Sequence, residues 1–246
     1  MLAFIVLEQA SARRQESTVL QFFLHGQELA HEHAEAKARV NISHCTYIYL
    51  DRRTDRRDLI EHEISAAGLS CDRLSAVDAK GLQMSGRNAC RLSHVHALER
   101  LEASDAPYGL ILEDDVTWKE TTDVVQEHLG NVAKAIQKHP VILLSCNPTD
   151  NPWGGPTEFD WLIFVFNCQT TSAYIVRRHY ARKLLDLWKA QNVIIDVAWK
   201  GLQQVDSWGL MWPVLARQRA SFSDIENMPV DYGVIQLDSS GTSHQK

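Results

Sequence analysis

The chain has 246 residues, of which 45% are hydrophobic and 23% charged, so it is long enough to bury a full core as one domain with a small appendage. Its 25 basic and 31 acidic residues give a formal charge of -6. This balance argues against a nucleic-acid binder and against a polybasic membrane anchor, because both depend on a basic surface. An anionic ligand would need a local basic cluster or a metal ion.

The cysteines and the first residues bear on the compartment. The five cysteines are scattered without a CxxC pair, which is typical neither of a zinc ribbon nor of a disulfide-rich secreted scaffold. The pattern predicts mostly reduced thiols and is compatible with one disulfide. Residues 1–7 are apolar, but no basic residue precedes the run and Glu8 ends it, unlike a signal peptide. No stretch is long enough to cross a bilayer. We therefore expect no membrane span and favour a cytoplasmic location.

Both ends of the chain differ from its middle. Residues 27–39 are rich in Ala, Glu and His and contain no turn residue, which predicts a polar helix. We therefore expect residues 1–40 to form an N-terminal appendage. Residues 238–246 are small and polar and predict a disordered tail. The main domain then spans residues 41–237.

Within this domain, short β-prone runs alternate with longer amphipathic stretches. The first half predicts a strand at 45–50, a helix from 54 or 55 to 67, a strand near 73–77, a helix carrying Leu92, Val95, Leu98 and Leu101 on one side, and a strand at 108–112. Gly68 is the expected end of the first helix.

The second half continues the alternation. It predicts a helix at 121–138, a strand at 141–144, a long loop at 146–160, strands at 161–166 and 170–176, and helices at 178–189 and 196–203. Such alternation predicts an α/β domain with a mostly parallel central sheet. Ligands of such sheets bind at the carboxyl ends of the strands.

Three acidic residues, Glu113, Asp114 and Asp115, follow the apolar strand at 108–112 directly. A solvated loop or a helix N-terminus also accommodates such a triplet. However, Val116 and Trp118 follow at once, so the carboxylates would be packed close together, where they repel each other unless a cation is present. Oxygen ligands favour Mg²⁺ or Mn²⁺. The triplet therefore indicates a divalent-cation site.

Six segments occur in an order that extends over most of the domain. They are IYLDRRTDRR at 48–57, CRLSH at 90–94, ILEDD at 111–115, TTSAYIV at 170–176, Ile195-Asp196, and Gln218 with SDI at 223–225. Together they resemble glycosyltransferase family 25, the lipopolysaccharide and procollagen galactosyltransferase group. The chain departs from the family pattern at Tyr49, where Asn is usual, and at Ala89, where Gly is usual.

The resemblance implies a GT-A type nucleotide-sugar-binding fold, a UDP-sugar donor (often UDP-galactose), dependence on Mn²⁺ and inversion at the anomeric carbon. The acceptor would be a hydroxyl of a glycan or glycoconjugate. The metal would be held chiefly by Asp115, with help from Glu113 or Asp114, and whichever acid is left would contact ribose or sugar.

The basic and acidic residues around these motifs receive expected roles. Among the arginines at 52–57, Arg52 and Arg56 are the preferred candidates for donor contacts, although they could instead pair with neighbouring acids. Asp196 is the expected general base, because an inverting mechanism needs a carboxylate near the acceptor. It could equally cap the following helix. Asp224 is the alternative base.

Ser93 and His94 are candidate donor contacts, although the sequence favours a structural role for His94 over a donor contact. Neither His31/His33 nor His94/His96 places both rings on one helix face, which argues against a histidine metal site. Trp153 lies in the long loop, where an indole could stack on a sugar or pin the loop.

Two other classes of protein remain open. A catalytically silent GT-A shell could serve as a carbohydrate-binding or adhesion protein. A metal-dependent phosphohydrolase would need more ligands on several strand ends than the sequence offers. A nucleophilic hydrolase is disfavoured because no G-x-S-x-G elbow occurs.

Overall fold

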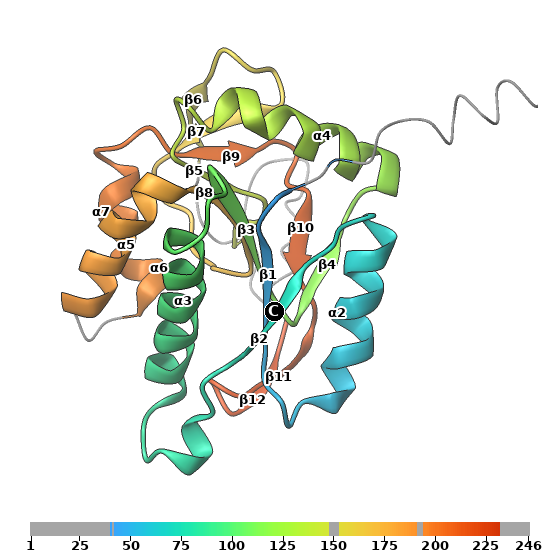
Figure 1. Ribbon diagram of the computed structural model, residues 1–246, viewed down its shortest axis with the longest axis vertical. Coiled ribbons are helices and arrows are strands. Elements are labelled where there is room, and N and C mark those ends of the chain that lie inside the picture. Colours follow the sequence, from blue (N-terminus) through green and yellow to red (C-terminus); the bar gives the residue numbers. More distant parts are fainter. Residues whose placement is uncertain (1–39, 41, 148–152, 191–193, 232–246) are drawn as a thin grey trace, which may run out of the picture. The chain divides into compact units, whose positions relative to one another are not determined.

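The computed structural model describes residues 40, 42–147, 153–190 and 194–231. The chain divides into two units, Met1–Arg39 and Val40–Lys246. The predicted N-terminal helix and the predicted disordered tail lie outside the described residues. Everything below concerns the second unit (Figure 1).

An eight-stranded sheet forms the centre of this unit. Its strands in spatial order are β2 (Asp72–Ser75), β1 (Cys45–Tyr49), β3 (Tyr108–Glu113), β8 (Ala173–Arg177), β5 (Val141–Leu143), β9 (Gly209–Met211), β7 (Leu162–Val165) and β6 (Trp153–Pro156). Only β8 and β7 run against the direction of the other six. The predicted α/β fold with a mostly parallel sheet is confirmed.

Helices cover both faces of the sheet (Figure 1). One face carries α3 (Gly86–Glu102), α5 (Arg178–Ala190), α6 (Ile195–Ala198) and α7 (Lys200–Gln203), and the other carries α2 (Thr54–Ala66) and α4 (Thr122–Ala135). Successive side chains of a strand point to opposite faces, so Ile111 enters one apolar cluster while Leu110 and Leu112 enter the other. Burial on both faces explains why the central strands read as continuous apolar runs.

Local signals set several element boundaries. Ser85 caps α3, because its hydroxyl accepts a hydrogen bond from the backbone N–H of Asn88 at 3.2 Å. Gly68 follows α2 with a φ of 64°, as expected of a residue that ends a helix in the left-handed region. The predicted helix at 196–203 is two short helices, α6 and α7, which meet at the buried Trp199.

Several short elements differ from the sequence-based expectation. The strand β6 lies within the predicted loop 146–160, and Thr170 precedes β8 with a φ of 103° rather than belonging to a strand. Four short strands form two further pairs: β4 (Val116–Trp118) with β10 (Ala216–Gln218), and β11 (Ser221–Ser223) with β12 (Met228–Val230). These strands are too short to carry a recognisable alternation.

The prediction of mostly reduced thiols is wrong. Cys45 is bonded to Cys71 and Cys146 to Cys168, which leaves Cys90 as the free cysteine. The first bridge follows from the sheet: β1 and β2 pair in parallel with Thr46 opposite Asp72, so the preceding residues, Cys45 and Cys71, are neighbours too. The spacing of the cysteines along the chain does not reveal this strand register, so the pairing cannot be predicted from it.

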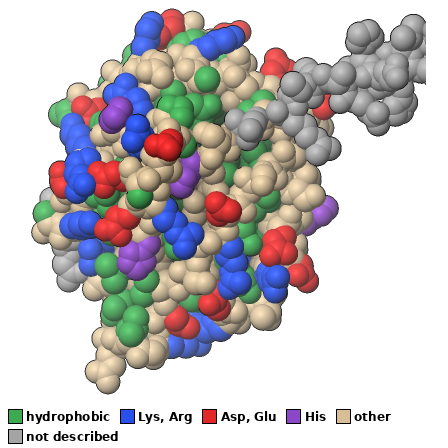
Figure 2. Space-filling model, in the orientation of Figure 1, with side chains coloured by type: hydrophobic (Ala, Val, Ile, Leu, Met, Phe, Trp, Pro, Cys, Tyr) green, Lys and Arg blue, Asp and Glu red, His purple; other side chains and the backbone are tan. Residues whose placement is uncertain are grey.

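In the part of the chain that the structure describes, no helix combines the length and the apolar character needed to cross a membrane. Basic and acidic side chains are interspersed over the face drawn in Figure 2. On that face, an attraction for a charged ligand therefore has to come from local groups.

Candidate functional site

The ends of several strands meet at one edge of the sheet. The strands β1 and β3 run parallel, so Leu50 and the acids from Glu113 onward both leave at their carboxyl ends. Because β8 is antiparallel to β3, the segment before β8 starts at this same edge. Residues far apart in sequence therefore surround one site.

A first pocket of about 740 Å³, open solvent included, lies at this edge. Its lining includes nearly all the site residues expected from the sequence: Arg52, Arg56, Ser93, His94, Glu113, Asp114, Asp115 and Asp224. The remaining one, Asp196, lines a second pocket of about 880 Å³. Cys90, Glu113 and Gln218 line both pockets, so the two adjoin.

Arg56, on α2, links the acids to the β11–β12 hairpin. Its Nη1 donates to Asp114 Oδ1 at 2.7 Å and to Asp115 Oδ2 at 3.1 Å. Its Nη2 donates to Ser221 Oγ at 2.6 Å and to the carbonyl of Phe222 at 2.9 Å. The guanidinium thus acts as an internal counter-charge for two of the three acids.

Arg52 and the neighbouring Arg53 hold Asp224 in the same way. Arg52 Nη1 lies 2.7 Å from Asp224 Oδ1, and Arg53 Nη1 lies 2.6 Å from Asp224 Oδ2. Burial acts to raise the pKa of Asp224, but the hydrogen bonds and charges of the two arginines outweigh it, and the pKa falls below its ordinary value. A carboxylate stabilised in this way is a weak proton acceptor, which disfavours Asp224 as the general base.

The three acids have different surroundings. Glu113 Oε1 accepts from Thr171 Oγ1 at 2.6 Å and contacts His94 Nε2 at 3.0 Å. Burial alone would raise the pKa of Glu113, but His94, Thr171 and the charge of Arg56 lower it. Burial raises the pKa of Asp114, and it raises that of Asp115 to about 7, with the charge of Glu113 adding to the effect.

Asp115 has the features of a cation ligand. Its Oδ2 accepts from Gln218 Nε2 at 2.9 Å, whereas its Oδ1 is buried and has no hydrogen-bond partner among the described residues. A buried acceptor without a partner is costly. A divalent cation would satisfy it, with Asp114 close by as a second oxygen ligand. Glu113 instead hydrogen-bonds His94 and Thr171. The three carboxylates therefore do not converge on one point, contrary to the expectation from the sequence.

Asp196 faces the second pocket from the first turn of α6. Its Oδ2 accepts from the backbone N–H of Thr170 at 3.2 Å, and its Oδ1 is buried without a partner in the described part of the chain. Burial, and then the charge of Glu113, raise its pKa. The residue at the N-cap position is Ile194, so Asp196 does not cap the helix.

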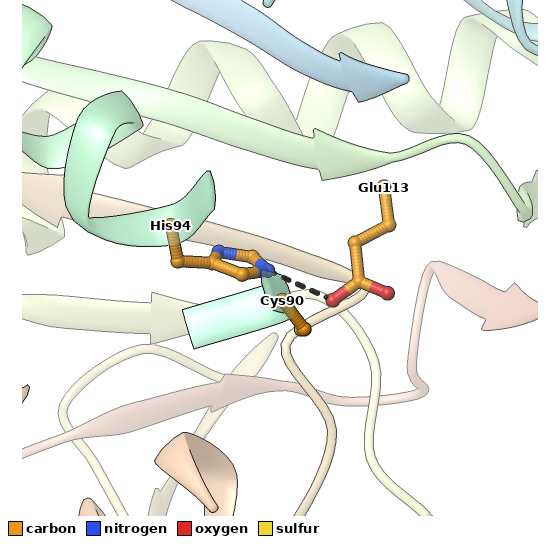
Figure 3. Close-up of side chains that lie close together, drawn as sticks. All are labelled: Cys90, His94 and Glu113. Atoms are coloured by element: carbon orange, nitrogen blue, oxygen red, sulfur yellow. Dashed lines mark hydrogen bonds and ion pairs between the residues drawn. The ribbon is translucent and has the colours of Figure 1, made fainter. Parts of the chain in front are cut away.

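Ser93 and His94 lie on α3, and both are buried. Ser93 Oγ donates to the carbonyl of Ala89 at 2.8 Å and accepts from the N–H of Val77 at 2.9 Å, which ties α3 to the segment after β2. His94 uses both ring nitrogens, since Nδ1 lies 3.1 Å from the Tyr174 hydroxyl and Nε2 contacts Glu113 (Figure 3). Through these contacts Ser93 positions the segment after β2, and His94 positions Tyr174 and Glu113.

Sequence reasoning missed other residues of the site. Cys90 precedes His94 by four positions, a spacing that places both on one face of α3, and this signal was available in the sequence. Thr170, beside Asp196, has a positive φ, which is unfavourable for a β-branched residue. Backbone strain of this kind is often found at functional sites. No sequence signal marks that strain. The side chain of Trp153 lies outside the described residues.

No protein-family model matches this chain, and no curated protein matches it. Among solved structures it is similar to A197 from STIV, with a TM-score of 0.45 and 15% identity over 76% of this chain and 93% of that one. It is also similar to a UDP-glucose pyrophosphorylase complexed with UDP-glucose, with a TM-score of 0.42 and 10% identity over 68% and 89% of the two chains.

A third similar structure is a glycosyltransferase involved in the glycosylation of the major capsid of PBCV-1. Its TM-score is 0.37, with 10% identity over 61% of this chain and 66% of that chain. At these scores the overlaps do not identify the function of this chain.

Proposed function

We propose that this protein is a glycosyltransferase that moves a hexose from a UDP-sugar to a hydroxyl of a glycan or glycoconjugate, with inversion and with the help of Mn²⁺ or Mg²⁺. One observation supports it above all. The residues that the family resemblance marks, scattered from Arg52 to Asp224, line two adjoining pockets at the carboxyl edge of the sheet. The first pocket would hold the donor and the second the acceptor.

The charge of the first pocket supports a role for a cation. Two arginines face five carboxylates there, those of Asp78, Glu113, Asp114, Asp115 and Asp224. A diphosphate would be repelled by this excess unless a divalent cation accompanied it. Asp115, through its unpartnered Oδ1, and Asp114 would hold that cation, which would neutralise the negative charge that develops on the departing diphosphate.

Arg52 and Arg56 would bind the donor by exchanging partners. Arg56 is held by Asp114 and Asp115, and Arg52 by Asp78 and Asp224. A cation on the acids would weaken their hold on Arg56 and free its guanidinium for a phosphate oxygen. Donor and cation would therefore bind cooperatively.

Asp196 would take the proton from the acceptor hydroxyl. Asp196 and Glu113 both line the second pocket, and the buried Oδ1 of Asp196 has no hydrogen-bond partner among the described residues. Burial raises its pKa, which makes it a stronger base than an exposed aspartate. The bond from Thr170 to its Oδ2 fixes the orientation of the carboxylate.

Calorimetric titration of the purified chain with UDP, with and without Mn²⁺, tests the proposal. We expect micromolar binding that requires Mn²⁺ and is lost in Asp115→Asn. The exposed Asp123 on α4 provides a matched control, so Asp123→Asn should bind as wild type does. A wild-type protein that ignores UDP in the presence of Mn²⁺ would overturn the donor assignment.

Turnover tests the role of Asp196. We expect Asp196→Asn to bind UDP normally but to release UDP from UDP-hexoses at least about 100-fold more slowly, the usual effect of removing a general base. Asp186→Asn, an exposed position on α5, is the control. Equal rates for wild type and Asp196→Asn would exclude Asp196 as the base.

The arrangement of Arg56 favours one alternative, a catalytically silent carbohydrate-binding or adhesion protein. An arginine that already neutralises Asp114 and Asp115 can replace a metal ion structurally. This alternative predicts that glycans bind without Mn²⁺ and that no UDP-hexose is turned over. Mn²⁺-dependent turnover of a UDP-hexose would exclude it.

A further inference from the structure

Cys90, His94 and Glu113 meet where the two pockets adjoin (Figure 3). One ligand atom from each, a sulfur, a nitrogen and an oxygen, all lie within 4.8 Å of one another. Cys90 and His94 project from the same face of α3, and Glu113 projects from the end of β3. Two rigid elements therefore hold the three groups together.

We propose that Cys90, His94 and Glu113 form a Zn²⁺ site with three protein ligands. This site is independent of the hard-cation site on Asp114 and Asp115, and it does not rest on the proposed glycosyl transfer. Thiolate, imidazole and carboxylate are the three ligand types that bind zinc in proteins, and three of them with an open fourth position are typical of catalytic zinc.

The separations suit such an ion. Ligand atoms around tetrahedral zinc lie roughly 3.3–3.6 Å apart, given metal–ligand bonds of about 2.0–2.3 Å. His94 Nε2 and Glu113 Oε1 are 3.0 Å apart, and Cys90 Sγ lies within 4.8 Å of one ring nitrogen of His94 and one carboxylate oxygen of Glu113. Small side-chain rotations bring all three to bonding distance.

The surrounding contacts orient the ligands. The Tyr174 hydroxyl lies 3.1 Å from His94 Nδ1, so with Nε2 on the metal the ring carries its proton on Nδ1 and donates it to Tyr174. The Thr171 hydroxyl holds Glu113 Oε1 at 2.6 Å. Outer partners of this kind are the usual support of zinc ligands.

Charge also favours a cation here. Thiolate and carboxylate together balance the two charges of zinc, and the thiol proton leaves to solvent on binding. Asp114, Asp115 and Asp196 lie close enough for their charges to act on Cys90. Because Cys90 and Glu113 line both pockets, the fourth coordination position opens into the cavity, where water or a substrate oxygen can reach it.

Titration of the chelator-treated full chain with Co²⁺, followed by absorbance, tests the site. We expect one Co²⁺ per chain with thiolate-to-metal charge-transfer absorption, and displacement of Co²⁺ by Zn²⁺. Cys90→Ser should abolish the absorption and His94→Gln should weaken the affinity at least about 100-fold, whereas His96→Gln, an exposed position on the same helix, should match wild type. Tyr174→Phe should weaken the affinity by about 10- to 100-fold.

Absence of the charge-transfer absorption in wild type, or its persistence in Cys90→Ser, would overturn the proposal. A second measurement needs no variant: Zn²⁺ should slow alkylation of the free Cys90 thiol at least about 10-fold in wild type, since coordination blocks the nucleophile. An unchanged alkylation rate would also overturn it. Asp115→Asn should lose Mn²⁺-dependent UDP binding but retain the Co²⁺ absorption, so the two sites can fail separately.

Discussion

At the scale of single residues, the surroundings of the acids at the end of β3 stabilise the charged form of one acid and destabilise that of another. Glu113 is stabilised in its charged form by His94 and Thr171. Asp115 is not, because its burial and the charge of Glu113 outweigh Arg56 and Gln218. A group kept in an unfavourable state by the fold is characteristic of functional sites, where stability is given up for binding or chemistry.

Asp115 therefore makes stability depend on pH. The pKa of Asp115 rises from 3.8 to about 7 in the folded protein, so between these values the folded state binds more protons than the unfolded state. Stability must then fall as pH rises through this window. We expect Asp115→Asn to remove this part of the loss and to raise the free energy of unfolding at pH 8 by a few kcal/mol, at most about 4 kcal/mol.

Urea denaturation of wild type and Asp115→Asn at pH 5 and pH 8 measures the effect. Asp123→Asn should follow wild type at both values. Addition of Mn²⁺ at pH 8 should recover part of the lost stability of wild type, because a ligand that binds only the folded state stabilises it. Parallel pH dependences of wild type and Asp115→Asn would contradict the assignment.

At the scale of elements, the β11–β12 hairpin closes one side of the first pocket. Arg53 and Arg56 bind its backbone at Phe222, and Asp224 and Ile225 line the pocket. The start of α3 lies against the hairpin: a Cβ on Gly86 would stand 3.0 Å from Ile225 Cα and 3.2 Å from the carbonyl oxygen of Asp224. Gly86 thus allows a close approach of helix and hairpin.

We expect Gly86→Ala to push the hairpin outward by a few tenths of an ångström and to weaken Mn²⁺-dependent UDP binding about five-fold, or about 1 kcal/mol. Gly201→Ala on α7 is the matched control, because a Cβ there meets nothing within 4 Å. Titration calorimetry compares the two variants with wild type. Equal affinities for Gly86→Ala and Gly201→Ala would show that the hairpin position does not affect the donor pocket.

At the scale of the described domain, two apolar clusters and two disulfides stabilise the fold. The clusters lie on opposite faces of the sheet. Cys45–Cys71 joins neighbouring strands across 26 residues, and Cys146–Cys168 joins segments at the second pocket across 22. Bridges of this kind persist in oxidising compartments.

Loss of the first bridge should be measurable in thermal unfolding. A loop of this length contributes about 3 to 4 kcal/mol by restricting the unfolded chain. We expect Cys45→Ala/Cys71→Ala to lower the midpoint by roughly 10 °C in a domain of this size. A reducing agent should lower the midpoint of wild type by at least as much. If neither change shifts the midpoint, the bridge does not form in solution.

The sequence by itself determined those features that depend on neighbouring residues. The apolar runs at 45–50 and 108–112, the periodicity of α3 and the placement of three acids at a strand end all follow from local propensity and pattern. Arg52, Arg56 and Asp115 follow predicted strands at the ends where ligands of such sheets bind, whereas Asp196 was expected at the site from the family resemblance. All of them line the two adjoining pockets.

Only the tertiary structure decided which of these residues are partners. The contact of Arg56 with Ser221 spans 165 residues, and that of Glu113 with Thr171 spans 58. The second contact exists because β8 enters the sheet beside β3 in the antiparallel direction. Strand order and register are set by packing of the whole core rather than by any local signal. For the same reason, the pairing of Cys45 with Cys71 and the meeting of Cys90 and His94 with Glu113 required the fold.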